Sequence, residues 1–230
     1  LMNHPGVALV LATGGSAMVK SAYSTGKPAL GVGPGNVPCY IEKTANIERA
    51  CTDLMLSKTF DNGMVCASEQ TVVVDEEIAN EFEKFMKENN CYFLKDDEID
   101  KVTKYVIKPD SEAVNPIIVG KTANFIAKEA GISVPEKTKI LIAHIPDATP
   151  EYPLAFEKLS PILSYIKVKN SEQGFEMCKR VLELGGLGHS AVIHSSNDEL
   201  ISEFGKAMKV GRVISNSPSS QGAIGDIYNT

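Results

Sequence analysis

Short apolar runs alternate along this chain with longer segments in which apolar residues recur every three or four positions. The first run, 8–12, predicts a buried strand, and the segment 17–25 after a Thr-Gly-Gly-Ser turn predicts a short helix. Gly26 and Pro28 stand where that helix should stop, and apolar residues resume directly after them. The order of strand, glycine-rich turn, helix and strand predicts one βαβ unit at the start of the chain.

The same alternation continues to the end of the chain. Asn46 suits the N-cap of a helix that carries Cys51 on its apolar face, and Asn62-Gly63 breaks this helix before a strand over 71–75. Helices are also predicted after Asp75 and over 97–106, 122–130, 171–184 and 198–208, with strands over 28–33, 39–42, 139–145, 161–168, 190–195 and 212–216. Strands interleaved with helices predict an α/β fold with a largely parallel sheet.

Composition and charge narrow the classes of partner. Hydrophobic residues make up 43% of the 230 residues, so a substantial core can form. The net charge is −6 and no long basic run occurs, which argues against nucleic acid as the main partner. No apolar stretch reaches the roughly 18 residues that a membrane-spanning helix needs, so no membrane association is expected. Because the chain opens at Leu1 without methionine and runs almost at once into a strand, we expect a piece of a longer chain.

The cysteines indicate free thiols. There are five, an odd number, at wide spacings and without a Cys-x-x-Cys pair, which argues against a zinc site and suits a reducing cytoplasm. Cys51 and Cys178 fall on apolar helix faces, which is typical of buried inert thiols. Cys66 instead follows Asn62-Gly63 on a loop, where a thiol could act as a nucleophile if nearby N–H groups lower its pKa. Local sequence leaves both a structural and a catalytic role open for Cys66.

Glycine-rich turns offer a second candidate site. Thr13, Gly14 and Gly15 join a predicted strand to a predicted helix, and free N–H groups at such a place suit a phosphate or a ribose. The turn lacks the full Gly-x-Gly-x-x-Gly pattern, so taken alone it favours a purely topological role. The segment 31–35, Gly-Val-Gly-Pro-Gly, comes closer to the pattern, but no helix follows it directly. We therefore do not interpret 31–35 as a phosphate loop.

Two polar residues remain ambiguous when taken singly. His189 lies between a glycine pair and a predicted strand, which suits either a site residue or a hydrogen-bonded structural histidine. Glu157 precedes a predicted strand and could simply face solvent. Neither belongs to a spacing that by itself defines a catalytic arrangement, because such partners meet only in space.

Five segments, taken together in their order along the chain, remove much of the ambiguity about the roles of these candidate residues. They are "LATGGSAMVKSAYSTGKPALGVGPGN", "SKTFDNGMVCASEQTVVVD", "FEKLSPIL", "LGGLGHSAVIHS" and "SNSPSSQGAIGDIYN". Together they spread over nearly all 230 residues. In this order the chain resembles the aldehyde dehydrogenase superfamily, most closely its CoA-acylating branch and the N-terminal half of bifunctional aldehyde–alcohol dehydrogenases.

The resemblance implies a role for each candidate residue. Cys66 would be the nucleophile that forms a thioester with the acyl group, and Thr13, Gly14 and Gly15 would line the site for the nicotinamide dinucleotide. Glu157 would hold the hydroxyl groups of the nicotinamide ribose.

His189 matches a segment of the acylating branch and would lie near the site. The resemblance also implies two domains: 1–61 as the C-terminal part of a Rossmann-like dinucleotide-binding domain, and 62–230 as the catalytic domain. The metal ligands of an iron-dependent alcohol dehydrogenase half are not in this sequence, so no metal is expected.

The activity that the resemblance implies is a CoA-acylating aldehyde dehydrogenase that uses NAD and takes coenzyme A as co-substrate. Acetaldehyde or a similar short aldehyde would be converted reversibly to acyl-CoA in the cytoplasm, by a full-length protein expected to form a homo-oligomer. A hydrolytic dehydrogenase, a semialdehyde-specific acylating enzyme and a non-catalytic fragment with a role in assembly are the alternatives. The hydrolytic branch has a glutamate base upstream of its cysteine, and the matching position here is Gly31.

Overall fold

The computed structural model describes residues 1–108 and 114–225. At its start, strand β1 (Val10–Thr13), helix α1 (Ser16–Tyr23) and strand β2 (Ala29–Val32) form a parallel two-stranded sheet with one covering helix. This confirms the predicted βαβ unit. Helix α1 ends at Tyr23, slightly before the predicted end, and Gly26 beyond it has a φ of 72°, a left-handed conformation that suits glycine.

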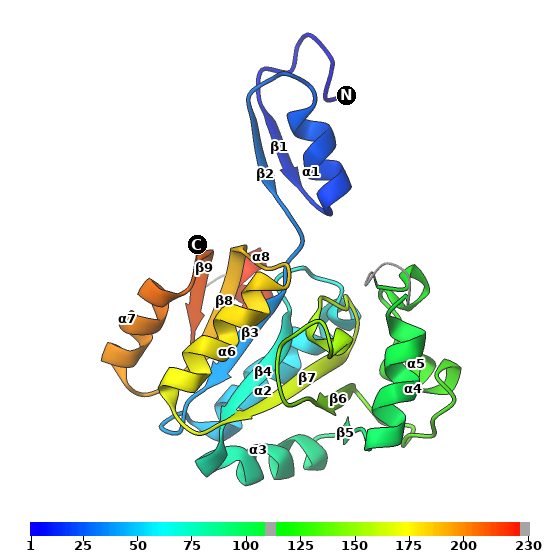
Figure 1. Cartoon of the computed structure of the whole chain (residues 1–230), viewed down its shortest axis with the longest axis vertical. Coiled ribbons are helices and arrows are strands. Elements are labelled where there is room, and N and C mark those ends of the chain that lie inside the picture. Colours follow the sequence, from blue (N-terminus) through cyan, green and yellow to red (C-terminus); the bar gives the residue numbers. More distant parts are fainter. Residues whose placement is uncertain (109–113, 226–230) are drawn as a thin grey trace.

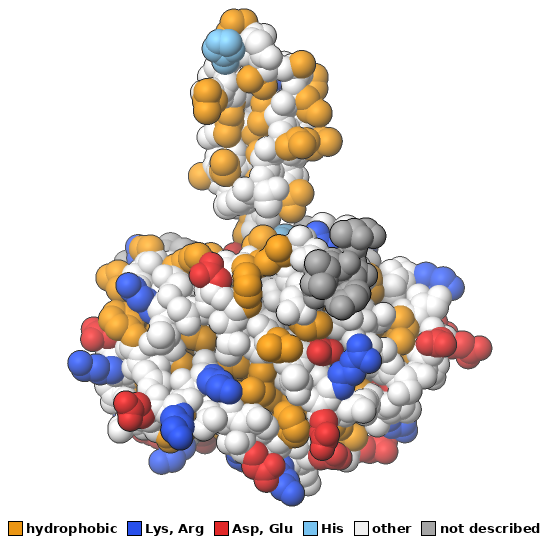
Figure 2. All heavy atoms as spheres, turned by 180° about the vertical axis from the view of Figure 1, so that it is seen from behind, with side chains coloured by type: hydrophobic (Ala, Val, Ile, Leu, Met, Phe, Trp, Pro, Cys, Tyr) orange, Lys and Arg blue, Asp and Glu red, His pale blue; other side chains and the backbone are white. Residues whose placement is uncertain are grey.

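The βαβ unit stands apart from the rest of the chain (Figure 1) and has an uncovered apolar face. Val10 and Ala12 are buried against α1, whereas Leu11 and Leu30, which pair across the two strands, are 73% and 63% exposed. Figure 2 shows hydrophobic side chains gathered on this unit. This face could pack against further protein.

The main sheet has seven parallel strands in the order β5-β6-β7-β4-β3-β8-β9. Their bounds are β3 (Val37–Ile41), β4 (Glu69–Asp75), β5 (Cys91–Phe93), β6 (Ile140–His144), β7 (Ile162–Val168), β8 (Gly188–His194) and β9 (Val210–Ser215). Central strands β3 and β4 are buried on both faces, as expected for a parallel sheet covered by helices. The largely parallel α/β fold predicted from the sequence is confirmed.

Helices cover both faces of this sheet (Figure 1). Helices α2 (Ile47–Thr59) and α3 (Glu76–Glu88) pack on one face, where Cys51, Leu54 and Phe82 meet alternate strand residues. Helices α6 (Ser171–Glu183) and α7 (Asp198–Ala207) cover the other face around β3 and β8, and α4 (Asp96–Val106) and α5 (Ala123–Glu129) cover it around β6. In the described ranges no helix combines the length and the apolar character of a membrane span.

Three features differ from the sequence prediction or go beyond it. Strand β5 and the short helix α8 (Ser219–Ile224) were not predicted, since neither is long enough to show a period. The two sheets separate between Val32 and Val37, because β3 pairs with β4 and β8. The division into a dinucleotide-binding and a catalytic domain stays a prediction.

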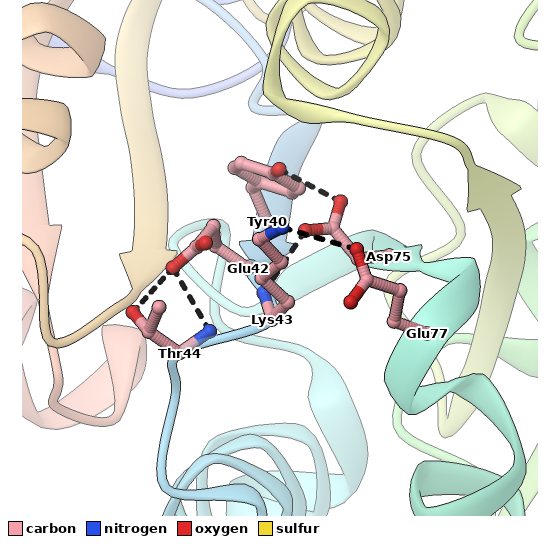
Figure 3. Close-up of polar contacts among 6 residues, drawn as sticks. All are labelled: Tyr40, Glu42, Lys43, Thr44, Asp75 and Glu77. Carbon is pink, nitrogen blue, oxygen red and sulfur yellow. Dashed lines mark hydrogen bonds and ion pairs between the residues drawn. The ribbon is translucent and has the colours of Figure 1, made fainter.

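The carboxyl ends of β3, β4 and β8 are closed by a polar network, part of which Figure 3 shows. Asp75 does begin α3, as predicted, but its side chain does not cap the helix. Its carboxylate instead accepts from the Tyr40 hydroxyl at 2.8 Å and from the N–H of Lys43 at 2.9 Å. Glu42 accepts from the hydroxyl groups of Thr44 and Ser195. The hydrogen-bonding groups of this network satisfy one another. The candidate catalytic residues lie at the opposite edge of the sheet, where the amino ends of the strands meet.

Candidate active site

Four loops meet at the amino edge of the main sheet. Because β7, β4, β3 and β8 are neighbours and parallel, the segments that lead into them lie side by side. These segments carry Glu157 before β7, Cys66 before β4, Gly35 before β3 and His189 at the start of β8. The topology therefore brings together three of the residues singled out in the sequence, Cys66, Glu157 and His189.

The break after α2 places the turn that carries Cys66. Asp61, Asn62 and Gly63 all have positive φ values, of 47°, 51° and 71°. A Cβ on Gly63 would lie 2.7 Å from the carbonyl oxygen of Ser160, so only glycine fits there. The Asn62 side chain donates a hydrogen bond of 3.0 Å to the carbonyl of Gly120 and holds the break. The chain then turns tightly through Cys66 into β4, as the Asn-Gly signal indicated.

Gly35 is the contact point of the site. A Cβ at this position would lie 2.4 Å from the carbonyl oxygen of Cys66 and 3.2 Å from Cδ2 of His189. The N–H of Gly35 donates a hydrogen bond of 3.2 Å to Oε1 of Glu157. The sequence interpretation rejected 31–35 as a phosphate loop and gave Gly35 no role. Only the close approach of three loops shows why a glycine stands there.

Cys66 differs from the other cysteines in exposure. All five lie within the described ranges, and Cys66 alone is partly exposed while Cys39, Cys51, Cys91 and Cys178 are buried. Burial raises the pKa of the Cys51 and Cys91 thiols to about 12, which keeps them protonated and inert. The inert role predicted for Cys51 agrees with this burial.

Opposing influences act on the Cys66 thiol. Burial raises its pKa most, and the nearby carboxylate of Glu157 raises it further. The N–H groups of Cys66 and Ala67, and the guanidinium of Arg212, lower the pKa. The balance leaves the pKa above its usual value, so the thiolate form depends on the charge of its neighbours.

Burial shifts the pKa values of both Glu157 and His189. Burial raises the pKa of Glu157 to about 7, against the hydrogen bond from Gly35 and the positive charge of Lys58 and Lys158. For His189, burial and the charge of Arg212 lower the pKa, which favours the neutral ring. Nδ1 of His189 is buried and has no hydrogen-bond partner among the described residues. A neutral imidazole with one unpaired nitrogen can accept a proton.

Arg212 on β9 is a site residue that the sequence interpretation missed. It lies opposite Ser190 in the pairing of β8 and β9, one residue beyond His189. Within 1–108 and 114–225 its guanidinium has no recorded hydrogen bond or ion pair. The signal in the sequence was a single arginine in an apolar strand, which by itself indicates nothing about a site.

Thr13, Gly14 and Gly15 lie at the carboxyl end of β1, in the separate two-stranded sheet. The N–H of Gly14 donates to the carbonyl of Val32, and no described hydrogen bond joins this turn to Cys66 or Glu157. Helix α1 begins at Ser16 after the N-cap residue Gly15, without a side-chain cap, and nothing lies within 4 Å of a Cβ built on Gly15. Uncapped N–H groups beside open space fit the phosphate or ribose of a dinucleotide.

The sequence and the fold together decide the family. The family model described as "Aldehyde dehydrogenase family" matches residues 1–225. The chain belongs to the aldehyde dehydrogenase family. Within this family it is similar to the aldehyde-alcohol dehydrogenase of Streptococcus pneumoniae, with 51% identity over the whole chain, which covers 27% of that protein.

Solved structures of the same family are similar to the described fold. An acetylating aldehyde dehydrogenase from Geobacillus thermoglucosidasius superposes with a TM-score of 0.94 at 43% identity, over 98% of this chain and 49% of that one. A Rhodopseudomonas palustris propionaldehyde dehydrogenase with bound propionyl-CoA gives a TM-score of 0.88 at 31% identity, over all of this chain and 50% of that one. This chain thus spans about half the length of these two solved chains and 27% of the Streptococcus pneumoniae protein.

Proposed function

We propose that this chain forms the cysteine-bearing part of an NAD-dependent, CoA-acylating aldehyde dehydrogenase. A short aldehyde such as acetaldehyde, CoA and NAD would give acyl-CoA and NADH, reversibly. The observation that carries the proposal is the position of Cys66, the partly exposed cysteine, at the amino edge beside Glu157 and His189. The similarity to an acetylating dehydrogenase and to one with bound propionyl-CoA supports it.

Cys66 acts as the nucleophile. In the direction of acyl-CoA reduction, its Sγ attacks the carbonyl carbon of the acyl group, a new C–S bond forms, and the C–S bond to CoA breaks. The N–H groups of Cys66 and Ala67 and the charge of Arg212 favour the thiolate that makes this attack. The covalent thioester divides one difficult step into two easier ones.

His189 moves the proton of the CoA sulfur. As CoA leaves, its sulfur takes up a proton, and in the reverse direction CoA gives up that proton before it attacks the thioester on Cys66. The His189 ring is held in its neutral form by burial and by the charge of Arg212, and a neutral imidazole can take up and release this proton.

Thr13, Gly14, Gly15 and Glu157 would hold the nicotinamide dinucleotide. When bound, this cofactor supplies or accepts the hydride that interconverts the acyl and aldehyde levels. The uncapped start of α1 suits the phosphate or ribose part, and the Glu157 carboxylate can accept hydrogen bonds from ribose hydroxyls. Gly35 fixes the direction of that carboxylate.

The setting of the full-length protein follows from the resemblance. We propose a cytoplasmic homo-oligomer that serves alcohol fermentation and needs no metal for this reaction. Small-molecule aldehyde and acyl-CoA are its partners.

Steady-state assays of the full-length protein test the proposal in both directions. With aldehyde, CoA and NAD we expect stoichiometric acyl-CoA and NADH, and with acyl-CoA and NADH we expect aldehyde. A protein that turns over in neither direction refutes the proposal. Rapid modification of one cysteine among the five would separate a catalytic role from a role in assembly, since an assembly piece needs no reactive thiol.

A further inference from the structure

A buried polar cluster lies directly behind the candidate active site and has no part in the mechanism above. It contains two lysines, Lys58 on α2 and Lys158 beside Glu157, and the side chain of each is fully buried. Lysine is almost never fully buried without a specific partner, because taking an ammonium out of water is costly. Both lysines contact Gln70, the second residue of β4.

Lys158 has three acceptors for its side-chain nitrogen. Nζ donates to the carbonyl of Gln70 at 3.1 Å, to that of Phe156 at 2.8 Å, and to that of Leu154. An ammonium has three N–H donors, so the number of acceptors matches the charged form. Burial and the nearby charge of Lys58 lower the pKa of Lys158, whereas the Glu157 carboxylate acts in the other direction. The contacts join two segments distant in sequence: the start of β4 and the segment 154–158.

Gln70 extends this connection to the turn of the nucleophile. Its side-chain Oε1 accepts from the N–H of Lys158 at 3.1 Å and from Nζ of Lys58 at 3.3 Å. Its Nε2 donates at 3.1 Å to the carbonyl of Ser68, two residues after Cys66. A continuous set of hydrogen bonds therefore runs from the turn that carries Cys66, through Gln70, to Lys158.

We propose that Lys158 is a positioning residue for Glu157. Its side-chain nitrogen ties the segment 154–158 to the start of β4. This tie holds the Glu157 carboxylate against the N–H of Gly35 and beside Cys66. The inference rests on the proposed function in one respect, the contact of Glu157 with the cofactor. The geometry of the tie itself does not depend on that contact.

The decisive variant is Lys158→Met in the full-length protein, because methionine fills the same space without N–H donors. We expect the N–H of Gly35 to exchange with solvent about tenfold faster, measured by deuterium uptake of peptides over 31–37, since its acceptor is no longer held. We expect NAD to bind about tenfold more weakly by calorimetry, while CoA binds within about twofold of the original protein.

A double-mutant cycle with Glu157→Gln separates positioning from general damage. If Lys158 acts through Glu157, then Lys158→Met adds no further loss of NAD affinity once Glu157 is already replaced. Independent losses that add up overturn the proposal. Asp75→Asn is the matched control, because it disturbs a buried charged network at the opposite end of β4. It should lower the melting temperature and leave exchange at Gly35 unchanged.

Two further variants cover the remaining outcomes. Lys58→Met removes a charge near Glu157 and one hydrogen bond to Gln70, and no bond from Lys58 to the segment 154–158 is recorded among the described residues. If Lys58→Met changes exchange at Gly35 as much as Lys158→Met does, then loss of a positive charge near Glu157 explains both effects, and the proposed tie through Lys158 is overturned. If Lys158→Met does not fold, Lys158→Gln is the replacement, because its amide is one bond shorter than the lysine side chain and has two N–H donors for three acceptors. Exchange at Gly35 should then still rise, and exchange equal to that of the original protein overturns the proposal.

The exchange readout keeps this inference distinct from the proposed function. A full-length protein that binds no NAD refutes the proposed function, yet exchange at Gly35 still reports whether Lys158 holds Glu157. A protein that binds NAD with unchanged exchange and affinity in Lys158→Met refutes the positioning role alone.

Discussion

The N–H of Gly35 donates a hydrogen bond of 3.2 Å to Oε1 of Glu157, across 122 residues of sequence. This bond joins the segment before β3 to the segment before β7, on either side of the turn that carries Cys66. It holds a carboxylate near Cys66, where its charge raises the pKa of the thiol. The guanidinium of Arg212 acts on the same thiol in the opposite direction.

Two charge-neutralising variants should change the reactivity of Cys66 in opposite directions. In Glu157→Gln the repelling charge is gone, the pKa of Cys66 falls, and alkylation by iodoacetamide at about pH 7.5 should be about threefold faster. In Arg212→Gln the favourable charge is gone, and alkylation should be slower by a similar factor. Mass spectrometry of the Cys66 peptide across a pH series gives the rates. Rates that move the same way in both variants contradict this electrostatic account.

Replacement of Cys66 should abolish activity without unfolding the protein. We expect Cys66→Ala in the full-length protein to lose aldehyde oxidation and acyl-CoA reduction together, by about 10⁴-fold or more, as removal of a nucleophile does elsewhere. Cys51→Ala and Cys178→Ala are the controls, since both side chains are buried in the core. These should lower the melting temperature and keep most of the turnover. Substantial turnover in Cys66→Ala would exclude it as the nucleophile.

CoA, not water, should release the acyl group. The position that matches the base of the hydrolytic branch is Gly31, and a Cβ there would lie 2.6 Å from Cγ1 of Val19 and 2.9 Å from Cε2 of Tyr23. Glycine cannot take a proton, and the packing of α1 leaves little room for a side chain. We expect acyl-CoA as the main product from aldehyde and NAD, with acid forming far more slowly when CoA is omitted. Acid formation at equal speed without CoA would favour the hydrolytic alternative.

His194 should destabilise the fold in acid. Its ring is buried, Nε2 has no partner among the described residues, and burial followed by the charge of Arg49 lowers its pKa to about 4. Below the ordinary pKa of about 6.5 the unfolded chain binds a proton that the folded chain refuses, so stability is lost as the pH falls towards 4. The full effect is about 3 kcal/mol in the free energy of unfolding.

Urea unfolding at several pH values, with His194→Asn as the comparison, measures this effect. Glu69, whose buried carboxyl has a pKa of about 7, acts in the opposite sense and loses its stabilising effect as the pH rises. The difference between variant and original protein isolates His194. A difference that does not change between about pH 7 and pH 4 contradicts the prediction.

The isolated 230 residues should bind NAD weakly or not at all. One βαβ unit of the proposed dinucleotide-binding domain is present, and the exposed face around Leu11 and Leu30 should promote self-association. Calorimetry and light scattering on this chain test both points. Micromolar NAD affinity would show that the unit around Gly14 and Gly15 is sufficient.

Local signals predicted the fold well because they act over a few residues. The Asn46 side chain does accept from the N–H of Arg49 and begins α2, and Gly26 has a left-handed conformation just beyond the end of α1. Asp75 shows the limit of such signals, because a partner from another strand, Tyr40, takes the carboxylate that the helix would otherwise use. A local pattern cannot report a competitor that lies 35 residues away.

The candidate site was less accessible to sequence reasoning. Cys66 stood out because it lies on a loop, without the apolar periodicity around the helical cysteines Cys51 and Cys178. Glu157 and His189 were ambiguous until the family resemblance implied a role for each. Arg212 and Lys158 were missed entirely. Their importance arises from strand order and from carbonyl groups that only the folded backbone brings together.

The closeness of Gly35 to Cys66 also limits how this sequence can diverge. A single added methyl group at position 35 would meet the carbonyl oxygen of Cys66 at 2.4 Å, whereas nothing lies within 4 Å of a Cβ at Gly33, two residues earlier. In a library of all single substitutions selected for turnover, small residues should be found at position 33, whereas only glycine should be found at position 35. Neutral drift would thus treat two neighbouring glycines differently: Gly33 could be replaced, whereas Gly35 would persist because the backbone of Cys66 lies against it.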